Sequence, residues 1–136
     1  MATTHFSGPV AVGAGRVKEI SAATTLTKDD SGSLVALTGI VGYAVTLPAA
    51  ADAKGASYRF VVQDLFATTD WVITSPAANM YGVLSELSTI QEVAAATTIN
   101  LELAADTIGD WIAVESDGTN WYVSGYCAKT GSVTPA

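Results

Sequence analysis

Side chains that could act as a nucleophile, a base or a metal ligand are few in this chain. Its 136 residues include one histidine, His5, and one cysteine, Cys127. A histidine-dependent catalytic triad and a two-histidine metal site are therefore excluded within one copy. We interpret His5 as a packing or hydrogen-bonding residue. We interpret Cys127 as a small buried hydrophobe, and a lone cysteine also excludes an internal disulfide.

Carboxylates are the remaining candidates for chemistry. Residues 28–32, KDDSG, resemble the start of a calcium loop but lack its ligand order and its distant bidentate glutamate. We interpret them as a turn in which an aspartate caps the backbone. Asp110 with Glu115, and Glu102 with Asp106, are formal candidates for glycoside hydrolysis, whose carboxylates pair in space. Small acidic β-domains carry such residues routinely, so the sequence predicts no enzyme, no metal site and no cofactor.

Several aromatic residues suggest a platform on which sugar rings stack. They are Trp71, Trp111, Trp121, Tyr122 and Tyr126. At strand spacing, tryptophan is more often a core or interface residue, since it buries a large apolar area. We favour that second interpretation.

Charged residues are scarce and unevenly distributed. They make up 14% of the chain, and the net charge is −7. Residues 60–128 contain no lysine or arginine but nine acids, namely Asp64, Asp70, Glu86, Glu92, Glu102, Asp106, Asp110, Glu115 and Asp117. This sign of charge argues against nucleic-acid binding. The acidic part either faces solvent or meets the basic part of another copy.

The low charge content also limits what the surface can be. A surface with so few charges must be coated with serine and threonine or covered by other protein. No run of about 18 apolar residues exists, so we expect no membrane partner. The length indicates a single domain.

Short β-rich runs separated by turn signals fill most of the chain. Alternating or apolar runs occur at 16–20, 33–38, 43–47, 58–62, 70–74 and 97–103, with weaker ones at 80–82 and 88–90. This pattern predicts an all-β fold, a small antiparallel β-sandwich or barrel of the jelly-roll or β-tulip-like kind. We expect the domain to span residues 16–128, after an extended N-terminal arm (1–15) and before a C-terminal tail (129–136).

Residues 109–125 predict a hairpin. Two β-rich runs flank Asp117-Gly118, a dipeptide favoured in two-residue type I′ turns. That turn would pair Ser116 with Thr119 and give the hairpin one apolar face. The other face is mixed and carries Trp111 and Tyr122, our candidate subunit interface.

Residues 1–15 contain no Asp, Glu, Lys or Arg, and they include three glycines and one proline. They are too irregular for a helix and too apolar for a typical disordered tail. We interpret them as an arm that binds another surface, through His5, Phe6, Pro9, Val10 and Val12.

Several short motifs resemble those of a known family. Residues 1–10, MATTHFSGPV, resemble the start of small virion proteins of tailed phages. LTKDDSG at 26–32, VTLP at 45–48 with Gly55, and SDGTNWYVSG at 116–125 resemble phage capsid-decorating and tail-fibre β-modules. The closest resemblance is to head decoration (cement) proteins.

The resemblance implies a small β-rich homotrimer on the outer surface of the virion, at quasi-threefold positions of the capsid. Its partner would be the major capsid protein, with residues 1–15 lying across capsid or neighbouring decoration subunits, and it implies no catalytic residue. The alternative is a tail-fibre or receptor-binding module that binds host glycans.

Overall fold

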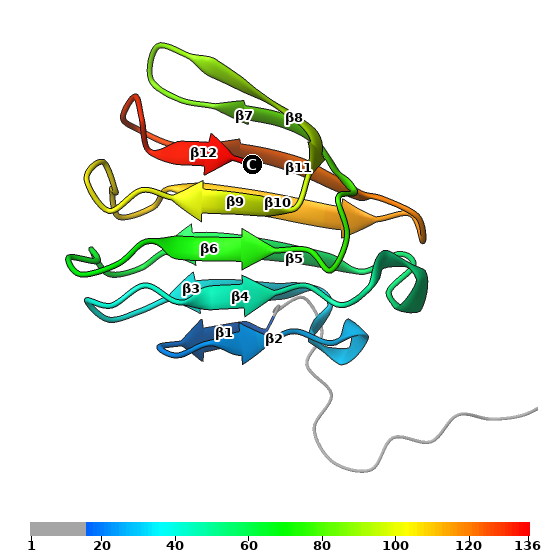
Figure 1. Cartoon of the computed structure of the whole chain (residues 1–136). Helices are drawn as coiled ribbons and strands as arrows, with labels where there is room; N and C mark the ends of the chain where they lie inside the picture. The colour runs from blue at the N-terminus through cyan, green and yellow to red at the C-terminus, as the bar shows by residue number, and fades with distance from the viewer. Residues whose placement is uncertain (1–15) are drawn as a thin grey trace, which may run out of the picture.

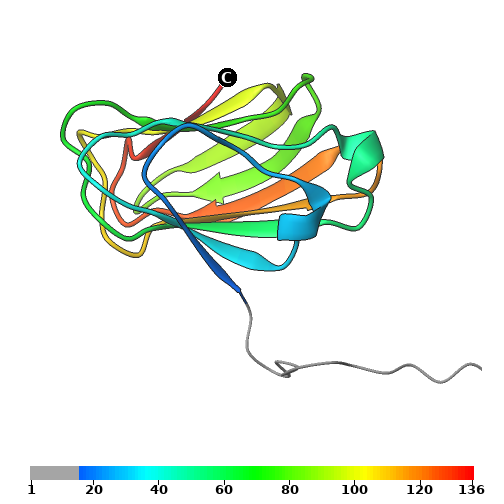
Figure 2. The ribbon, with the colours of Figure 1, turned by 90° about the horizontal axis from the view of Figure 1, so that it is seen from below.

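The computed structural model describes residues 16–136, which form a sandwich of two β-sheets (Figures 1 and 2). Sheet A has seven strands in the order β1 (Val17–Ile20), β3 (Ser33–Leu37), β5 (Ser57–Val62), β10 (Trp111–Ser116), β11 (Trp121–Tyr126), β7 (Met80–Ser85) and β8 (Ile90–Ala96). Sheet B has five strands in the order β12 (Val133–Pro135), β9 (Thr98–Leu101), β6 (Trp71–Thr74), β4 (Ala44–Thr46) and β2 (Thr24–Thr25). Two short 3₁₀ helices, η1 (Lys28–Asp30) and η2 (Ala50–Asp52), complete the elements. The all-β sandwich predicted from the sequence is confirmed.

The first six strands form a coil that alternates between the two sheets (Figure 1). After each strand the chain crosses to the other sheet and then returns, so β1, β3 and β5 are parallel in sheet A, and β2, β4 and β6 in sheet B. The later strands add mostly antiparallel pairings, such as β10 with β5 and β6 with β9. Both sheets are therefore mixed, whereas the sequence pattern favoured antiparallel ones. Hydrophobic alternation reports which side chains are buried and not the direction of the neighbouring strand.

The core lies between the sheets and is built from alternate residues of the strands. In β5, Tyr58, Phe60 and Val62 are buried, whereas the residues between them are not. Trp71 and Trp121 are both 0% exposed, so they are core residues and cannot take part in a sugar platform. Burying a large apolar side chain contributes roughly 1.5–3 kcal/mol, and the two indoles are among the largest of this core.

The hairpin of β10 and β11 has the expected buried face in a different register. Ser116 pairs with Trp121, whereas a two-residue turn would have paired it with Thr119. Residues 117–120 therefore form the loop. Because side chains alternate along a strand, a shift of two residues leaves each one on its expected face. Trp111 and Tyr122 consequently lie on the outer face of sheet A, as predicted.

Asp117 explains the longer loop. Its Oδ1 accepts hydrogen bonds from the backbone N–H of Asn120 at 2.7 Å and of Thr119 at 2.8 Å. An aspartate that bonds to its own downstream backbone makes an Asx turn, which competes with the type I′ turn. The Tyr122 hydroxyl donates to the other carboxylate oxygen at 2.8 Å. The N–H groups of Asn120 and Thr119 hold the pKa of Asp117 below its ordinary value.

The C-terminal stretch 129–136, expected to be a tail, contributes a strand to sheet B. β12 pairs with β9 through Val133 and Leu101 and forms the edge of that sheet. The backbone N–H groups of Thr97 and Thr98 donate to the Ala136 carbonyl at 2.8 and 2.9 Å. The sandwich therefore extends to the last residue of this sequence.

Candidate functional site

Besides the short connection at residues 21–23, five loops gather at one end of the sandwich, on the left in Figure 1. They are residues 38–43, 63–70, 86–89, 102–110 and 127–132, and we call them the loop end. They meet because β3, β5, β7, β9 and β11 all finish at this end. Loops held by a rigid β scaffold are common places for binding residues.

Carboxylates that range from buried (Glu86 and Asp110) to exposed (Asp64) join these loops to one another. Asp64 accepts the backbone N–H of Gly39 at 2.8 Å, which links the first two loops. Asp106 accepts that of Phe66 at 2.8 Å. Three further bonds of the same kind follow the loops around the end, from Leu103 to Asp70, from Ala128 to Asp110 and from Gly131 to Glu86. Hydrogen bonds to charged groups are worth about 1.5–3 kcal/mol each, so the five loops hold one another in place.

Glu86 is the most complete of these acceptors. It is 4% exposed, and its two oxygens accept the N–H groups of Gly131 at 3.0 Å and of Val133 at 2.9 Å. The β7–β8 loop thereby fixes the start of β12.

Asp110 is equally buried but only partly bonded. Its Oδ1 accepts the N–H of Ala128 at 2.8 Å, whereas its Oδ2 and the nearby hydroxyl of Thr107 are buried without a partner. Burial raises the pKa of Asp110 above its ordinary value, and the negative charge of Asp106 raises it further. The N–H groups of Ala128 and Thr107, and the Lys129 ammonium, act in the opposite direction. Asp110 therefore carries a desolvation cost when it is ionised.

Large aliphatic side chains stand at the tips of four of these loops. Ile40 is 65% exposed, Leu65 51%, Leu87 68% and Ile108 63%. Single exposed hydrophobic side chains are ordinary. These four, however, lie at the same end of the molecule, on loops joined by hydrogen bonds. They are therefore exposed apolar groups placed at intervals along this end of the sandwich.

An apolar area lies on the outer face of sheet A, over β7, β8, β10 and β11, beside the exposed acids Glu92 and Glu115. Its exposed or half-buried side chains, which we call the aromatic face, are Tyr81, Val83, Ile90, Trp111, Tyr122 and Tyr126. The strand register places Tyr81 beside Tyr122, and Tyr126 beside Trp111. The Arg59 guanidinium lies 4.6 Å from the centroid of the Trp111 ring, within cation–π range.

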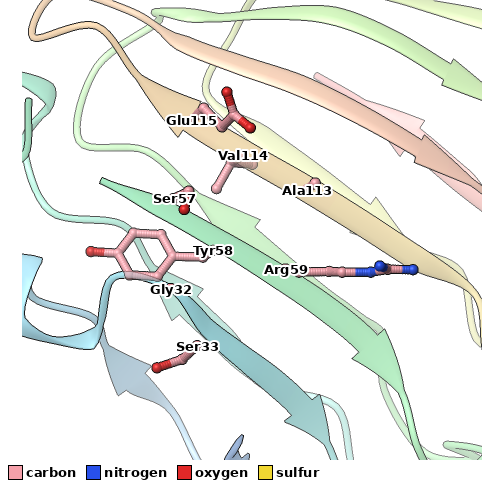
Figure 3. Close-up of a pocket in the computed structure, with 8 residues that line it drawn as sticks. All are labelled: Gly32, Ser33, Ser57, Tyr58, Arg59, Ala113, Val114 and Glu115. Carbon is pink, nitrogen blue, oxygen red and sulfur yellow. The ribbon is translucent and has the colours of Figure 1, made fainter. Parts of the chain in front are cut away.

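A shallow depression of about 150 Å³ opens on the same face (Figure 3). Its floor is made by small residues of β5, β10 and the turn before β3, and Arg59 and Glu115 extend beside it from β5 and β10. Glu115 pairs with Ser57 and Arg59 with Ala113, so the two charged residues are diagonal neighbours. The one ion pair within residues 16–136 joins Lys18 and Asp30. Arg59 and Glu115 thus make no salt bridge with each other.

The outer face of sheet B has a different chemistry. The register aligns one threonine from each of four neighbouring strands, in the order Thr25, Thr46, Thr74 and Thr98. Short hydroxyl side chains present a polar, uncharged surface to water. Exposed side chains without charge therefore gather in two places, the threonines on sheet B and the aromatic face on β7, β8, β10 and β11 of sheet A.

The residues singled out from the sequence have different outcomes. Trp111 is half-buried and Tyr122 is 49% exposed, and both lie on the aromatic face. The predicted arm residues His5, Phe6, Pro9, Val10 and Val12 lie outside the described residues. Cys127 is 1% exposed, and burial raises the pKa of its thiol to about 12, as suits a small buried hydrophobe.

Three of the acids considered as chemical candidates, Asp30, Asp106 and Asp110, accept hydrogen bonds from the backbone. Asp110 precedes β10 and is buried, whereas Glu115 is exposed near the other end of that strand, so the structure does not bring them together. Asp106 bonds to the Phe66 backbone. Asp30 caps the Thr27 N–H at 3.0 Å, as expected for the 28–32 turn. No group of three or more metal-ligating side chains occurs within residues 16–136.

The loop-tip residues were not singled out from the sequence. Ile40, Leu65, Leu87 and Ile108 stand within turn segments, close to glycine, aspartate or serine. A large aliphatic residue in a turn segment does not belong to the alternating pattern of a strand. That position is the sequence signal by which the four residues could have been found.

Comparisons with protein-family models, with curated proteins and with solved structures found no match. In the part of the chain that the structure describes, no helix has the length and apolar character needed to cross a membrane.

Proposed function

We propose that the protein is a non-enzymatic decoration (cement) protein that binds the outer surface of a phage capsid as a homotrimer and stabilises the head. The observation that carries the proposal is the loop end, where four exposed aliphatic side chains stand on loops joined by hydrogen bonds to carboxylates. A preformed apolar surface binds without first ordering flexible loops, so little conformational entropy opposes docking. The resemblance of the sequence motifs to decoration proteins supplies the partner, the major capsid protein.

Three copies acting together would strengthen each weak contact. Every loop end adds a modest apolar area, and a trimer holds three of them at once. The second and third contacts then form at high effective concentration. Residues 1–15, which carry no Asp, Glu, Lys or Arg, offer a further contact to the lattice.

The loop end can be tested by replacing two of its tips with a polar residue. The double substitution Ile40→Ser and Ile108→Ser removes apolar contact area, and we expect at least tenfold weaker binding to heads of the encoding phage that lack the protein. Because both side chains are more than 60% exposed, the melting temperature should change little. Binding is measured by co-sedimentation with purified heads.

The matched control is Ala44→Ser, an exposed position on the outer face of sheet B, which should bind like the wild type. Equal binding by the tip variant and the wild type would overturn the role of the loop end. Counting copies by mass spectrometry tests the function itself, since decoration requires hundreds of copies per virion and a tail fibre only a few.

The second candidate function is a glycan-binding module of a tail fibre. The observation in its favour is the aromatic face, where Tyr122 and Tyr126 are exposed, although Trp71 and Trp121 are buried. Tyrosine rings can stack on sugars. Saturable binding on a glycan array, lost on Tyr122→Ser, would favour this candidate over decoration.

A further inference from the structure

The aromatic face gathers more exposed aromatic and aliphatic side chains than the opposite face of the sandwich, which indicates a protein partner. It joins three exposed tyrosines and two exposed aliphatics to the half-buried Trp111 across neighbouring strands. The opposite face of the sandwich is lined by threonines. Contiguous apolar patches of this kind on a folded domain mark interaction surfaces.

The charges beside the depression indicate which partner fits. Arg59 and Glu115 are both exposed and lie diagonally across β5 and β10, yet they form no salt bridge within the chain. A second copy presents the same two charges. When the faces of two copies approach, Arg59 of one copy can meet Glu115 of the other.

The outer face of sheet A, of which the aromatic face is one part, is large enough for a specific contact. Seven strands about 4.8 Å apart, with about six residues at about 3.3 Å each, span roughly 30 by 20 Å. Covering two such faces would remove roughly 1,200 Å² from solvent, and a specific interface needs about 1,000 Å².

We propose that the outer face of sheet A is the contact between copies of this chain, with Arg59 of one copy paired to Glu115 of the next. The inference rests on the proposed function in so far as that function requires an oligomer. Around a common axis the pairing repeats from copy to copy, and the aromatic side chains pack between the charge pairs. The loop ends then point the same way, because the strands of every copy run along the axis.

Charge reversal tests the pairing. In Arg59→Glu both positions of the pair are negative, and in Glu115→Arg both are positive, so each single variant places like charges opposite each other. The combined variant Arg59→Glu with Glu115→Arg restores opposite charges at every contact. By sedimentation velocity we expect at least tenfold weaker self-association for each single variant and recovery to within about threefold in the double variant.

Two controls separate the pairing from general effects. Asp52→Arg and Lys28→Glu reverse exposed charges on η2 and η1, away from the face, and should associate like the wild type. Tyr81→Ser removes a ring without altering charge and should weaken association, while circular dichroism verifies that every variant folds.

Each outcome decides the proposal. A wild-type chain that is monomeric at 100 µM (about 1.4 mg/ml), single reversals that associate normally, or a double variant no better than the single ones would overturn it. A dimer that obeys the reversal pattern supports this interface but contradicts the trimer of the proposed function. A trimer insensitive to both reversals supports the trimer and overturns this interface.

Discussion

Six of the nine acids between residues 60 and 128 accept a hydrogen bond from a backbone N–H group: Asp64, Asp70, Glu86, Asp106, Asp110 and Asp117. Their abundance without neighbouring lysine or arginine is therefore largely structural. A backbone N–H can satisfy a carboxylate without a cation. The charge asymmetry of the sequence alone cannot distinguish such acceptors from a solvated acidic surface.

Asp110 gives a prediction at the residue scale. Its folded-state pKa is raised above the ordinary 3.8, chiefly by burial. The neutral carboxyl of Asp110 therefore gives its full contribution to the unfolding free energy below pH 3.8. This contribution is lost as the pH rises through the raised pKa. Asp110→Asn stays neutral and keeps an oxygen for the Ala128 N–H. We expect the unfolding free energy of Asp110→Asn, minus that of the wild type, to increase as the pH rises.

Urea unfolding of both proteins across a series of pH values measures this difference. The charged neighbours Asp106 and Lys129 are present in both proteins, so the comparison isolates the change at position 110. A difference that does not change with pH would contradict the desolvated state of Asp110.

At the scale of elements, β7 requires glycine at position 82, because the backbone of β11 leaves no space for a side chain there. Its φ is +153°, and a Cβ there would lie 1.9 Å from the Val123 carbonyl oxygen of β11. Both strands are fixed by their neighbours, so the clash cannot relax cheaply. We expect Gly82→Ala to lower the unfolding free energy by at least about 3 kcal/mol, as measured by chemical denaturation.

Gly131→Ala is the matched control. Gly131 also has a positive φ, +80°, but its Cβ would meet no atom within 4 Å. Only the left-handed backbone penalty applies, about 1–2 kcal/mol. Equal losses at the two positions would show that the approach of β11 to Gly82 is unimportant.

The elements were predictable where local pattern determines them. Alternating residues at 43–47, 58–62 and 97–103 identified β4, β5 and β9, because burial on one side repeats every second residue. The hairpin face was predictable for the same reason, but its register was not, since Asp117 selects an Asx turn. The parallel pairing of β1, β3 and β5 joins segments far apart in sequence, and no local signal encodes it.

The candidate site was predictable only in part. Trp111 and Tyr122 follow from strand alternation, and the structure adds Tyr81 and Tyr126 as their neighbours. Those neighbours depend on the pairing of β11 with β7, which a single sequence does not give. The loop end arises from five separate loops and becomes visible only when the strands are assembled.

At the scale of the whole molecule, residues 16–136 contain a buried core of their own. The buried cluster runs from Ile20 to Val133. We expect a variant lacking residues 1–12 to melt within a few degrees of the full chain and to keep its oligomeric state, while it no longer occupies phage heads. Differential scanning calorimetry and head-binding assays measure the two effects, and unchanged occupancy would refute the role of the arm.

The coil of the first six strands has an evolutionary consequence. Each turn of the coil contributes one strand to each sheet. The first turn consists of β1 and β2, which are edge strands of sheets A and B. Duplication of a single turn of this coil would add one strand to each sheet. The hairpins and the carboxylate-linked loops of the later strands would stay unaltered. The sandwich is therefore built to grow by insertion at one side, and relatives of different lengths should vary there first.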